Sequence, residues 1–186
     1  MGRQFRLEAL EIYVGSFETP LGPMVAVEDE EGALRRLSFL SERAPIGPAA
    51  VERPERCEPV ARQIAEYFDG SRKIFDLALG PEATPFQSEV WSALLEIPYG
   101  ALASYSEIAR RIGRPRAVRA VGAANGAKPI AIVIPCHRVV GRDGSLTGYG
   151  AGLSVKRWLL DHEAGRRPLP MPEPIGPPPT AARPAS

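Results

Sequence analysis

The stretch Ile134-Pro135-Cys136-His137-Arg138-Val139-Val140 places one of the two cysteines of this chain beside one of its two histidines. The residues just before it, 130–134, are apolar and mostly β-branched, so we expect a short buried strand there. Pro135 cannot donate to a sheet ladder and should end that strand. Cys136 should then lie where an ordered element gives way to a loop, which is a common position for reactive side chains.

Two interpretations of Cys136 are open at this point. A cysteine outside a disulfide often serves as a small buried hydrophobe. A thiol flanked by an imidazole and a guanidinium is instead a candidate thiolate, because nearby positive charge lowers the pKa of a cysteine. The polar pair His137 and Arg138 favours the second interpretation. The other cysteine, Cys57, lies in a charged stretch and is expected to be incidental.

The composition limits the class of protein. The 186 residues suffice for one or two domains with hydrophobic cores. No apolar run approaches the roughly 20 residues that cross a bilayer. No hydrophobic segment follows the N-terminus, so we expect no secretory signal and no membrane contact. A reactive thiol needs a reducing compartment, which predicts a cytoplasmic protein, associated with the nucleoid if it is bacterial.

We expect neither a metal nor a cofactor. The possible zinc ligands lack the usual spacing of such sites, and the glycine-rich loop at 141–152 lacks the Lys-Ser/Thr ending of a phosphate-binding loop. These possible ligands are Cys57, Cys136, His137 and His162.

The charge of the chain is unevenly distributed. The formal net charge is only +1, yet residues 101–142 contain eight basic side chains and a single acidic one, Glu107. Such a patch on a nearly neutral protein is typical of phosphate binding, although a solvated basic surface would have the same composition.

Residues 1–80 are predicted to form an N-terminal α/β support domain. Within 5–40, three β-rich runs alternate with turn-forming clusters, which indicates a small antiparallel meander. Residues 41–56 are expected to be an irregular loop, and 71–83 a strand-like piece with a linker. Between these segments an amphipathic helix should end at Asp69-Gly70. Its apolar positions are Val60, Ile64, Tyr67 and Phe68.

Residues 84–165 are predicted to form a second, mainly helical domain. Two capping-box patterns, at Thr84 and at Ser104, should each begin a helix. A third helix is expected over about 115–124, after a tight turn at Gly113, and the two short helices match helix-turn-helix geometry. Ser154 is expected to cap a last helix. The proline-rich tail, 166–186, is predicted to be disordered because it cannot build a core.

The third helix of this domain has an unusual outer face. At helical spacing, an apolar side faces inward, and the opposite side consists of alanines flanked by arginines. Small side chains allow a close approach to another molecule, and arginines can contact phosphates; alanine is also simply a good helix former. Together with the basic patch, this pattern favours DNA as the partner. The outer residues are Arg116, Arg119, Ala120, Ala123 and Ala124.

These motifs together resemble the O6-alkylguanine-DNA alkyltransferase family. The resemblance rests on the Cys136 stretch, on Arg119-Ala120-Val121-Gly122 before it, and on Gly148-Tyr149 and residues 159–163 after it. It covers residues 84–165 specifically, and Thr19-Pro20-Leu21-Gly22-Pro23 is similar to the N-terminal domain of the family. The resemblance implies a ribonuclease-H-like first domain and a winged-helix-like second domain.

The resemblance also implies a reaction. Cys136 would accept the alkyl group of O6-alkylguanine, and of O4-alkylthymine, in a single irreversible turnover, as a methylated-DNA–protein-cysteine S-methyltransferase does. His137 would act as the base through a water, and Glu163 would orient the imidazole. Tyr149, Val139 and Gly150 would line the base pocket.

By the same resemblance, the protein would bind double-stranded DNA through the minor groove, as a monomer, and rotate the damaged nucleotide out of the helix. Arg119 would fill the gap, and Tyr105 would crowd the target phosphate. Arg116, Ala120 and Ala123 would contact the DNA.

The chain departs from the family pattern at Lys128, where most members have a hinge asparagine. Lysine keeps a donor but loses the amide acceptor. Two alternatives therefore stay open: a non-catalytic module that binds alkylated guanine, which the presence of Cys136 disfavours, and a cysteine hydrolase that pairs Cys136 with His162.

Overall fold

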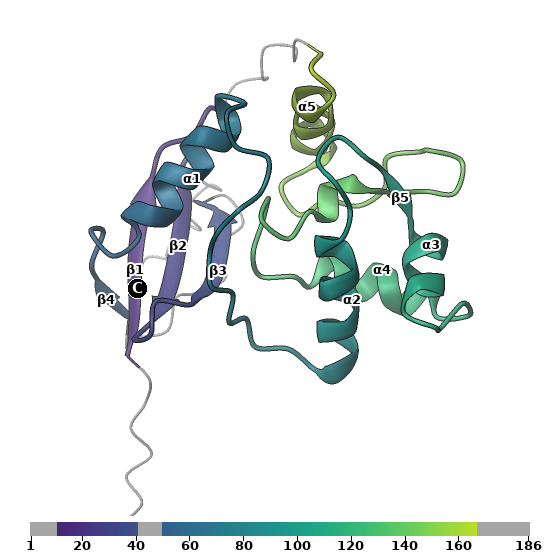
Figure 1. Ribbon diagram of the computed structural model, residues 1–186, viewed down its shortest axis with the longest axis horizontal. Coiled ribbons are helices and arrows are strands. Elements are labelled where there is room, and N and C mark those ends of the chain that lie inside the picture. Colours follow the sequence, from purple (N-terminus) through teal and green to yellow (C-terminus); the bar gives the residue numbers. More distant parts are fainter. Residues whose placement is uncertain (1–10, 41–49, 167–186) are drawn as a thin grey trace, which may run out of the picture.

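The computed structural model describes residues 11–40 and 50–166. A sheet with one covering helix lies beside a group of four helices (Figure 1). The predicted disordered tail lies outside the described residues, apart from Arg166. The predicted fold class, an α/β unit followed by a mainly helical unit, is confirmed.

The sheet contains the expected antiparallel meander. The strands β1 (Ile12–Phe17), β2 (Met24–Asp29) and β3 (Leu34–Phe39) pair in sequence order. A fourth strand, β4 (Ala50–Glu52), pairs in parallel with β1, so the prediction of an irregular loop over 41–56 was wrong at this point. Three residues are too few to show a period-two pattern, and only the neighbouring strand defines this one.

The helix α1 (Glu58–Phe68) covers one face of the sheet (Figure 1). It ends as predicted, with Asp69 at the C-cap and Gly70 in the left-handed region at φ 84°. The following segment, 71–83, forms no strand and makes only an isolated bridge between Leu79 and β3. The strand-like piece expected there was therefore wrong.

The helical unit begins with α2 (Pro85–Leu95) and continues through α3 (Tyr105–Arg111). Both predicted capping boxes are present, because the Thr84 and Ser104 side chains each accept a backbone hydrogen bond from the third residue of their helix. The third helix, α4 (Val118–Gly126), packs against both α2 and α3. The predicted helix-turn-helix pair is thus formed by α3 and α4.

Two short strands connect the start of α3 to the segment around Cys136. The strand β5 (Ala103–Ser104) pairs in parallel with β6 (Val139–Val140). The last helix, α5 (Leu153–Glu163), follows Gly152, which has a φ of 93°. Ser154 lies inside this helix and makes no capping bond, so the expected cap was misplaced.

The start of α4 and one of its faces also differ from prediction. The helix begins at Val118, three residues later than expected, because Pro115 and Arg116 form a turn. Ala124 is buried, not on the outer face. The indole Nε1 of Trp91 in α2 donates a hydrogen bond to the Ala124 carbonyl at 2.8 Å, so this part of α4 faces the core.

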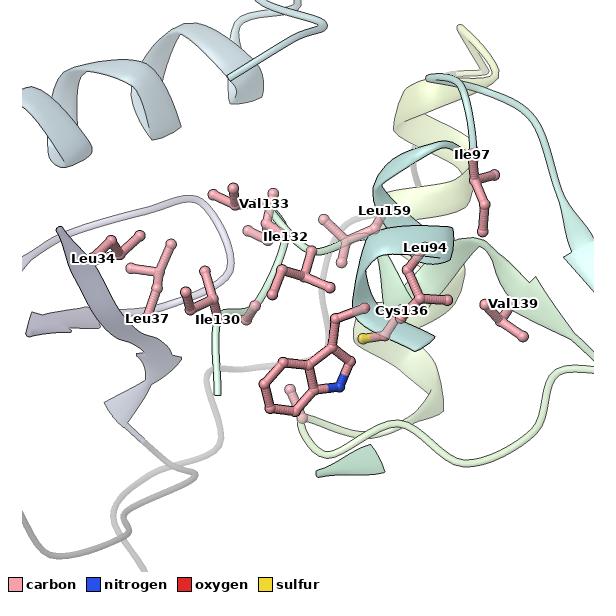
Figure 2. Close-up of a cluster of buried hydrophobic side chains, with 14 of the residues drawn as sticks. Leu34, Leu37, Leu94, Ile97, Ile130, Ile132, Val133, Cys136, Val139 and Leu159 are labelled. Atoms are coloured by element: carbon pink, nitrogen blue, oxygen red, sulfur yellow. The ribbon is translucent and has the colours of Figure 1, made fainter. Parts of the chain in front are cut away.

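The apolar run 130–134 is buried but does not form the expected strand. Ile130 bridges to Leu37 of β3, and the chain then turns, with Ile132 in the left-handed region at φ 67°. Figure 2 shows this segment between Leu34 and Leu37 of the sheet and Leu94 of α2. The run is apolar because it crosses a core shared by the two units, not because it lies within a sheet.

Candidate active site

Cys136 opens a single 3-10 turn, Cys136–Arg138, immediately after the buried run. Its side chain is only 3% exposed, but it lines a cavity of about 690 Å³, which is in the size range of small-molecule sites. Cys136 is therefore shielded from bulk water while it forms part of the wall of an open volume. The cavity is enclosed by residues of both units, including Ser38, Tyr105, Lys128, Tyr149 and Gly150.

His137 and Glu163 form a buried pair behind this cysteine. The His137 Nε2 and Glu163 Oε1 atoms lie 2.7 Å apart, and neither side chain is exposed to solvent. His137 lies in the 3-10 turn, and Glu163 is the last residue of α5. The structure therefore brings the three predicted catalytic residues to one end of α5, with Cys136 next to His137 in sequence.

The Glu163 carboxylate is held by donors from three other segments: the 3-10 turn, the turn at Gly100 and α1. Arg138 donates to its two oxygens from Nε at 2.8 Å and from Nη2 at 2.9 Å, and Gly100 donates its backbone N–H at 3.0 Å. The Tyr67 hydroxyl of α1 donates at 2.9 Å. Burial alone would raise the pKa of Glu163, but the hydrogen bonds and charges of His137 and Arg138 outweigh it and hold this pKa well below its ordinary value.

The ionised carboxylate fixes the state of the imidazole. Because Glu163 can only accept, His137 Nε2 must be the donor, which leaves Nδ1 with its lone pair. Nδ1 is buried and has no hydrogen-bond partner among the described residues. Burial outweighs the attraction of Glu163 and lowers the pKa of His137 below its ordinary value. At neutral pH the ring is therefore a neutral base with an available lone pair.

Lys156 is a buried cation that sequence reasoning did not single out. Its ammonium donates to the carbonyls of Val139 at 2.6 Å and Thr147 at 2.7 Å. Burial lowers the pKa of this lysine, while the nearby Cys136 opposes that shift. A sequence signal did exist, because Lys156 lies on the side of α5 that carries Val155 and Leu159, where a lysine would be unexpected.

The walls of the cavity contain most of the predicted pocket residues. Tyr149 and Gly150 line it, and Tyr105 does so from the first position of α3. The Tyr105 hydroxyl accepts a hydrogen bond from Thr147 at 3.1 Å. Val139 is fully buried and is not part of the cavity wall; its carbonyl binds Lys156 instead.

Lys128 belongs to the same cavity. It lines the cavity, and its ammonium is 5.7 Å from the centre of the Tyr149 ring, within the range of a cation–π contact. Its charge contributes to the low pKa of His137. Buried Asn125 of α4 also lines the cavity, and its Oδ1 atom has no partner among the described residues.

The outer side of α4 and the preceding turn is exposed beside the cavity. Arg116, Arg119, Ala120 and Ala123 all face solvent, as the helical spacing predicted. Tyr105 also packs against this helix, since its ring lies near Gly122. The exposed arginines and the wall of the cavity thus belong to the same pair of helices.

The remaining cysteine and histidine lie apart from this chemistry. Cys57 is buried before α1, and burial raises the pKa of its thiol to about 11. His162 Nε2 is hydrogen-bonded to the Tyr67 carbonyl at 2.7 Å, and its ring stacks on Trp158. Among residues 11–40 and 50–166, no three His, Cys, Asp or Glu side chains gather as a metal site would require.

Known families match both units of the chain. Residues 12–81 match the family described as 6-O-methylguanine DNA methyltransferase, ribonuclease-like domain. Residues 85–165 match the family described as 6-O-methylguanine DNA methyltransferase, DNA binding domain. This chain belongs to the 6-O-methylguanine DNA methyltransferase family. The resemblance inferred from the Cys136 stretch is therefore confirmed.

Individual relatives agree with this assignment. The chain is 47% identical over 154 residues to the methylated-DNA–protein-cysteine methyltransferase of Methanosarcina acetivorans, covering 82% of this chain and 98% of the relative. It is 45% identical over 156 residues to the Salmonella typhimurium protein of the same name, covering 78% and 91%. A crystal structure of Mycobacterium tuberculosis OGT in complex with DNA superposes with a TM-score of 0.79 at 42% identity, covering 84% and 95%.

In the part of the chain that the structure describes, no helix combines the length and the apolar character needed to cross a bilayer.

Proposed function

We propose that this chain repairs DNA by moving an alkyl group from guanine O6 to the Cys136 sulfur, the activity for which its relatives are named. The thiolate attacks the alkyl carbon, the C–S bond forms, and the C–O6 bond breaks. The thiol proton passes to His137 Nδ1 through a water, and the departing guanine takes up a proton. The thioether is stable, so each molecule reacts once.

The observation that carries this proposal is the arrangement around the sulfur. Cys136 lines a cavity, and its neighbour His137 has a buried lone pair on Nδ1 and an ionised carboxylate on Nε2. A nucleophile, a base and a group that orients the base are the parts that nucleophilic catalysis needs. The Lys156 ammonium adds positive charge that favours a thiolate at Cys136.

The partner of this family is DNA, and we propose that α4 approaches it from the minor groove. Ala120 and Ala123 leave room for close approach, and the flanking Arg116 can contact phosphates. Arg119 would enter the base stack, and Tyr105 would press on the target phosphate so that the damaged base turns into the cavity. The alkylated guanine would then lie against Tyr149.

The same proposal extends to the organisation of the protein. One copy contains every group that the reaction requires, which supports a monomer. We also propose an N-terminal support domain over 1–80, a DNA-binding and transfer domain over 84–165, and a cytoplasmic location.

Mass spectrometry of the intact protein tests the reaction. After incubation with O6-benzylguanine, we expect one added benzyl group per molecule, located on Cys136 by peptide mapping. Cys136→Ser should remain unlabelled. Cys57→Ser is the matched control and should be labelled like the unaltered chain, because the raised pKa of Cys57 makes that thiol a poor nucleophile. Several turnovers per molecule would contradict the proposal.

The two alternative functions receive no support from the site. A module that only binds the lesion has no use for a thiol on the cavity wall with a buried base next to it. A hydrolase that pairs Cys136 with His162 needs that imidazole at the sulfur, and His162 Nε2 is instead bonded to the Tyr67 carbonyl.

A further inference from the structure

The N-terminal unit contacts the catalytic pair through one side chain. Tyr67, one residue before the end of α1, is fully buried, and its hydroxyl donates to Glu163 Oε1 at 2.9 Å across 96 residues of sequence. The same oxygen accepts the bond from His137 Nε2. A group from the sheet unit therefore shares an acceptor atom with the imidazole that serves as the base.

The position of this hydroxyl is fixed from several sides. The Tyr67 carbonyl accepts a hydrogen bond from His162 Nε2, and His162 precedes Glu163 on α5. The Tyr67 ring packs against Phe68, Phe75 and Tyr99, with centroid distances between 5.4 and 6.0 Å. Both the backbone and the ring of Tyr67 are thus locked relative to α5, and the hydroxyl has little freedom to leave the carboxylate.

We propose that Tyr67 is a positioning residue for alkyl transfer, through which the N-terminal unit takes part in the reaction. This inference rests on the proposed role of Glu163 and His137. The hydroxyl holds the Glu163 carboxylate in the orientation that meets Nε2, and it withdraws charge from the oxygen that pairs with the imidazole. The N-terminal unit then does more than support the fold, since it changes the basicity of the His137 imidazole.

The electrostatic consequence has a definite sign. Glu163 stabilises the imidazolium form of His137, whereas Arg138 and Lys128 destabilise it. The Tyr67 O–H dipole offsets part of the negative charge of Glu163 and so weakens the first effect. Burial and the adjacent carboxylate raise the pKa of Tyr67, so its hydroxyl stays protonated and remains a donor across the working pH range.

Loss of this hydroxyl should make the imidazole easier to protonate. In Tyr67→Phe, the uncompensated carboxylate stabilises the imidazolium, and the pH below which His137 stops acting as a base moves upward. Each upward shift of about one pH unit lowers the rate about tenfold on the acid side, while the rate well above the transition changes little. A purely structural defect would lower the rate by the same factor at every pH.

The experiment compares rates of Cys136 labelling by O6-benzylguanine in the full chain between about pH 5 and about pH 8.5. We call the low-pH part of this profile, where the rate falls as His137 becomes protonated, the acid limb. In Tyr67→Phe the acid limb is expected to move to higher pH. The matched control is Tyr99→Phe, because Tyr99 belongs to the same aromatic cluster and its hydroxyl makes no hydrogen bond to Glu163. An unshifted limb in Tyr67→Phe, or an equal shift in both variants, would overturn the inference.

A second variant tests the role of the hydroxyl even if Tyr67→Phe does not fold. Incorporation of 3-fluorotyrosine at position 67 keeps the ring and strengthens the hydroxyl as a donor, so the acid limb should move to lower pH, opposite to the phenylalanine variant. An upward shift or no shift would count against the role of the hydroxyl.

The same measurements separate failure of the proposed function from failure of this inference. If the unaltered chain shows no labelling of Cys136, the proposed function itself fails. If the chain is labelled normally and the acid limb does not move in the Tyr67 variants, only the role of Tyr67 fails.

Discussion

His137 Nε2 lies 2.7 Å from Glu163 Oε1, although the two residues are 26 positions apart and both side chains are closed to solvent. Two effects compete in this pair. The carboxylate favours the imidazolium, and burial disfavours it; burial is the larger effect, so the pKa of His137 lies below its ordinary value. The pair therefore contains a neutral imidazole, not a charged one, at the position that follows Cys136 in the sequence.

This balance predicts the pH dependence of alkyl transfer. Because the pKa of His137 is lowered, the ring stays unprotonated as the pH falls through its ordinary value of about 6.5. The rate of Cys136 labelling by O6-benzylguanine should therefore be constant from about pH 8 to about pH 6.5 and decline only at lower pH. To measure this profile, the labelling reaction is quenched at set times at each pH, and the labelled fraction is determined by mass spectrometry. A decline that already begins above neutral pH would mean that the attraction of Glu163 outweighs burial.

Lys156 should stabilise the fold through its two carbonyl bonds. Lys156→Met keeps the aliphatic length but leaves the Val139 and Thr147 carbonyls without this donor. Leaving such buried groups unsatisfied costs about 1–3 kcal/mol, which we expect as the loss in unfolding free energy measured by urea denaturation.

The matched control for this variant is Arg157→Met, which removes an exposed cation from the next position of α5. It should change the unfolding free energy by less than about 0.5 kcal/mol. If Lys156→Met were no more destabilising than Arg157→Met, the buried ammonium would have no net structural role.

Local chemistry made a large part of the fold predictable. The capping boxes at Thr84 and Ser104 involve atoms three residues apart, and both form as expected. The end of α1 at Asp69-Gly70 is set by the left-handed preference of glycine, which is equally local. The prediction of a reactive thiol at Cys136 rests on equally local information, because a thiol and an imidazole are adjacent in the chain.

Features that depend on distant contacts were missed. The run 130–134 has the composition of a strand, but it turns within a core shared by the two units, and periodicity cannot separate these cases. Tyr67 has the spacing of an ordinary core residue, and nothing in the sequence indicates that its hydroxyl meets Glu163. Arg138 was interpreted as a positive charge near the thiol, and the sequence did not indicate that its guanidinium binds that same carboxylate.

The charge of Lys128 should influence the protonation of the His137 imidazole. Lys128→Asn removes a cation that lowers the pKa of His137. The acid limb of the labelling rate should therefore move to higher pH, by less than about one unit, because Lys128 is partly exposed and solvent screens its charge. Added salt should shrink the difference between the variant and the unaltered chain.

The matched control is Lys73→Asn. Lys73 also lies 5.7 Å from an aromatic ring, that of Tyr99, but it is exposed, and the cations that lower the pKa of His137 are Arg138 and Lys128. The limb should stay in place in this variant. A shift of the same size in both variants would show that Lys128 acts only through the overall charge of the protein.

Arg119 should matter for DNA and not for the chemistry. Its side chain is exposed on α4, outside the set of residues that line the cavity. Arg119→Ala should therefore slow repair of O6-methylguanine in duplex DNA by at least about tenfold, because flipping a base costs a few kcal/mol that the inserted side chain helps to offset. Reaction with free O6-benzylguanine, which needs no flipping, should stay within about twofold of the unaltered chain.

Arg62→Ala, which removes an exposed arginine from α1, serves as the control and should change neither rate. Equal losses on duplex DNA and on the free base would place the effect of Arg119 in the active site or in the fold, and a separate role in base flipping would then be wrong.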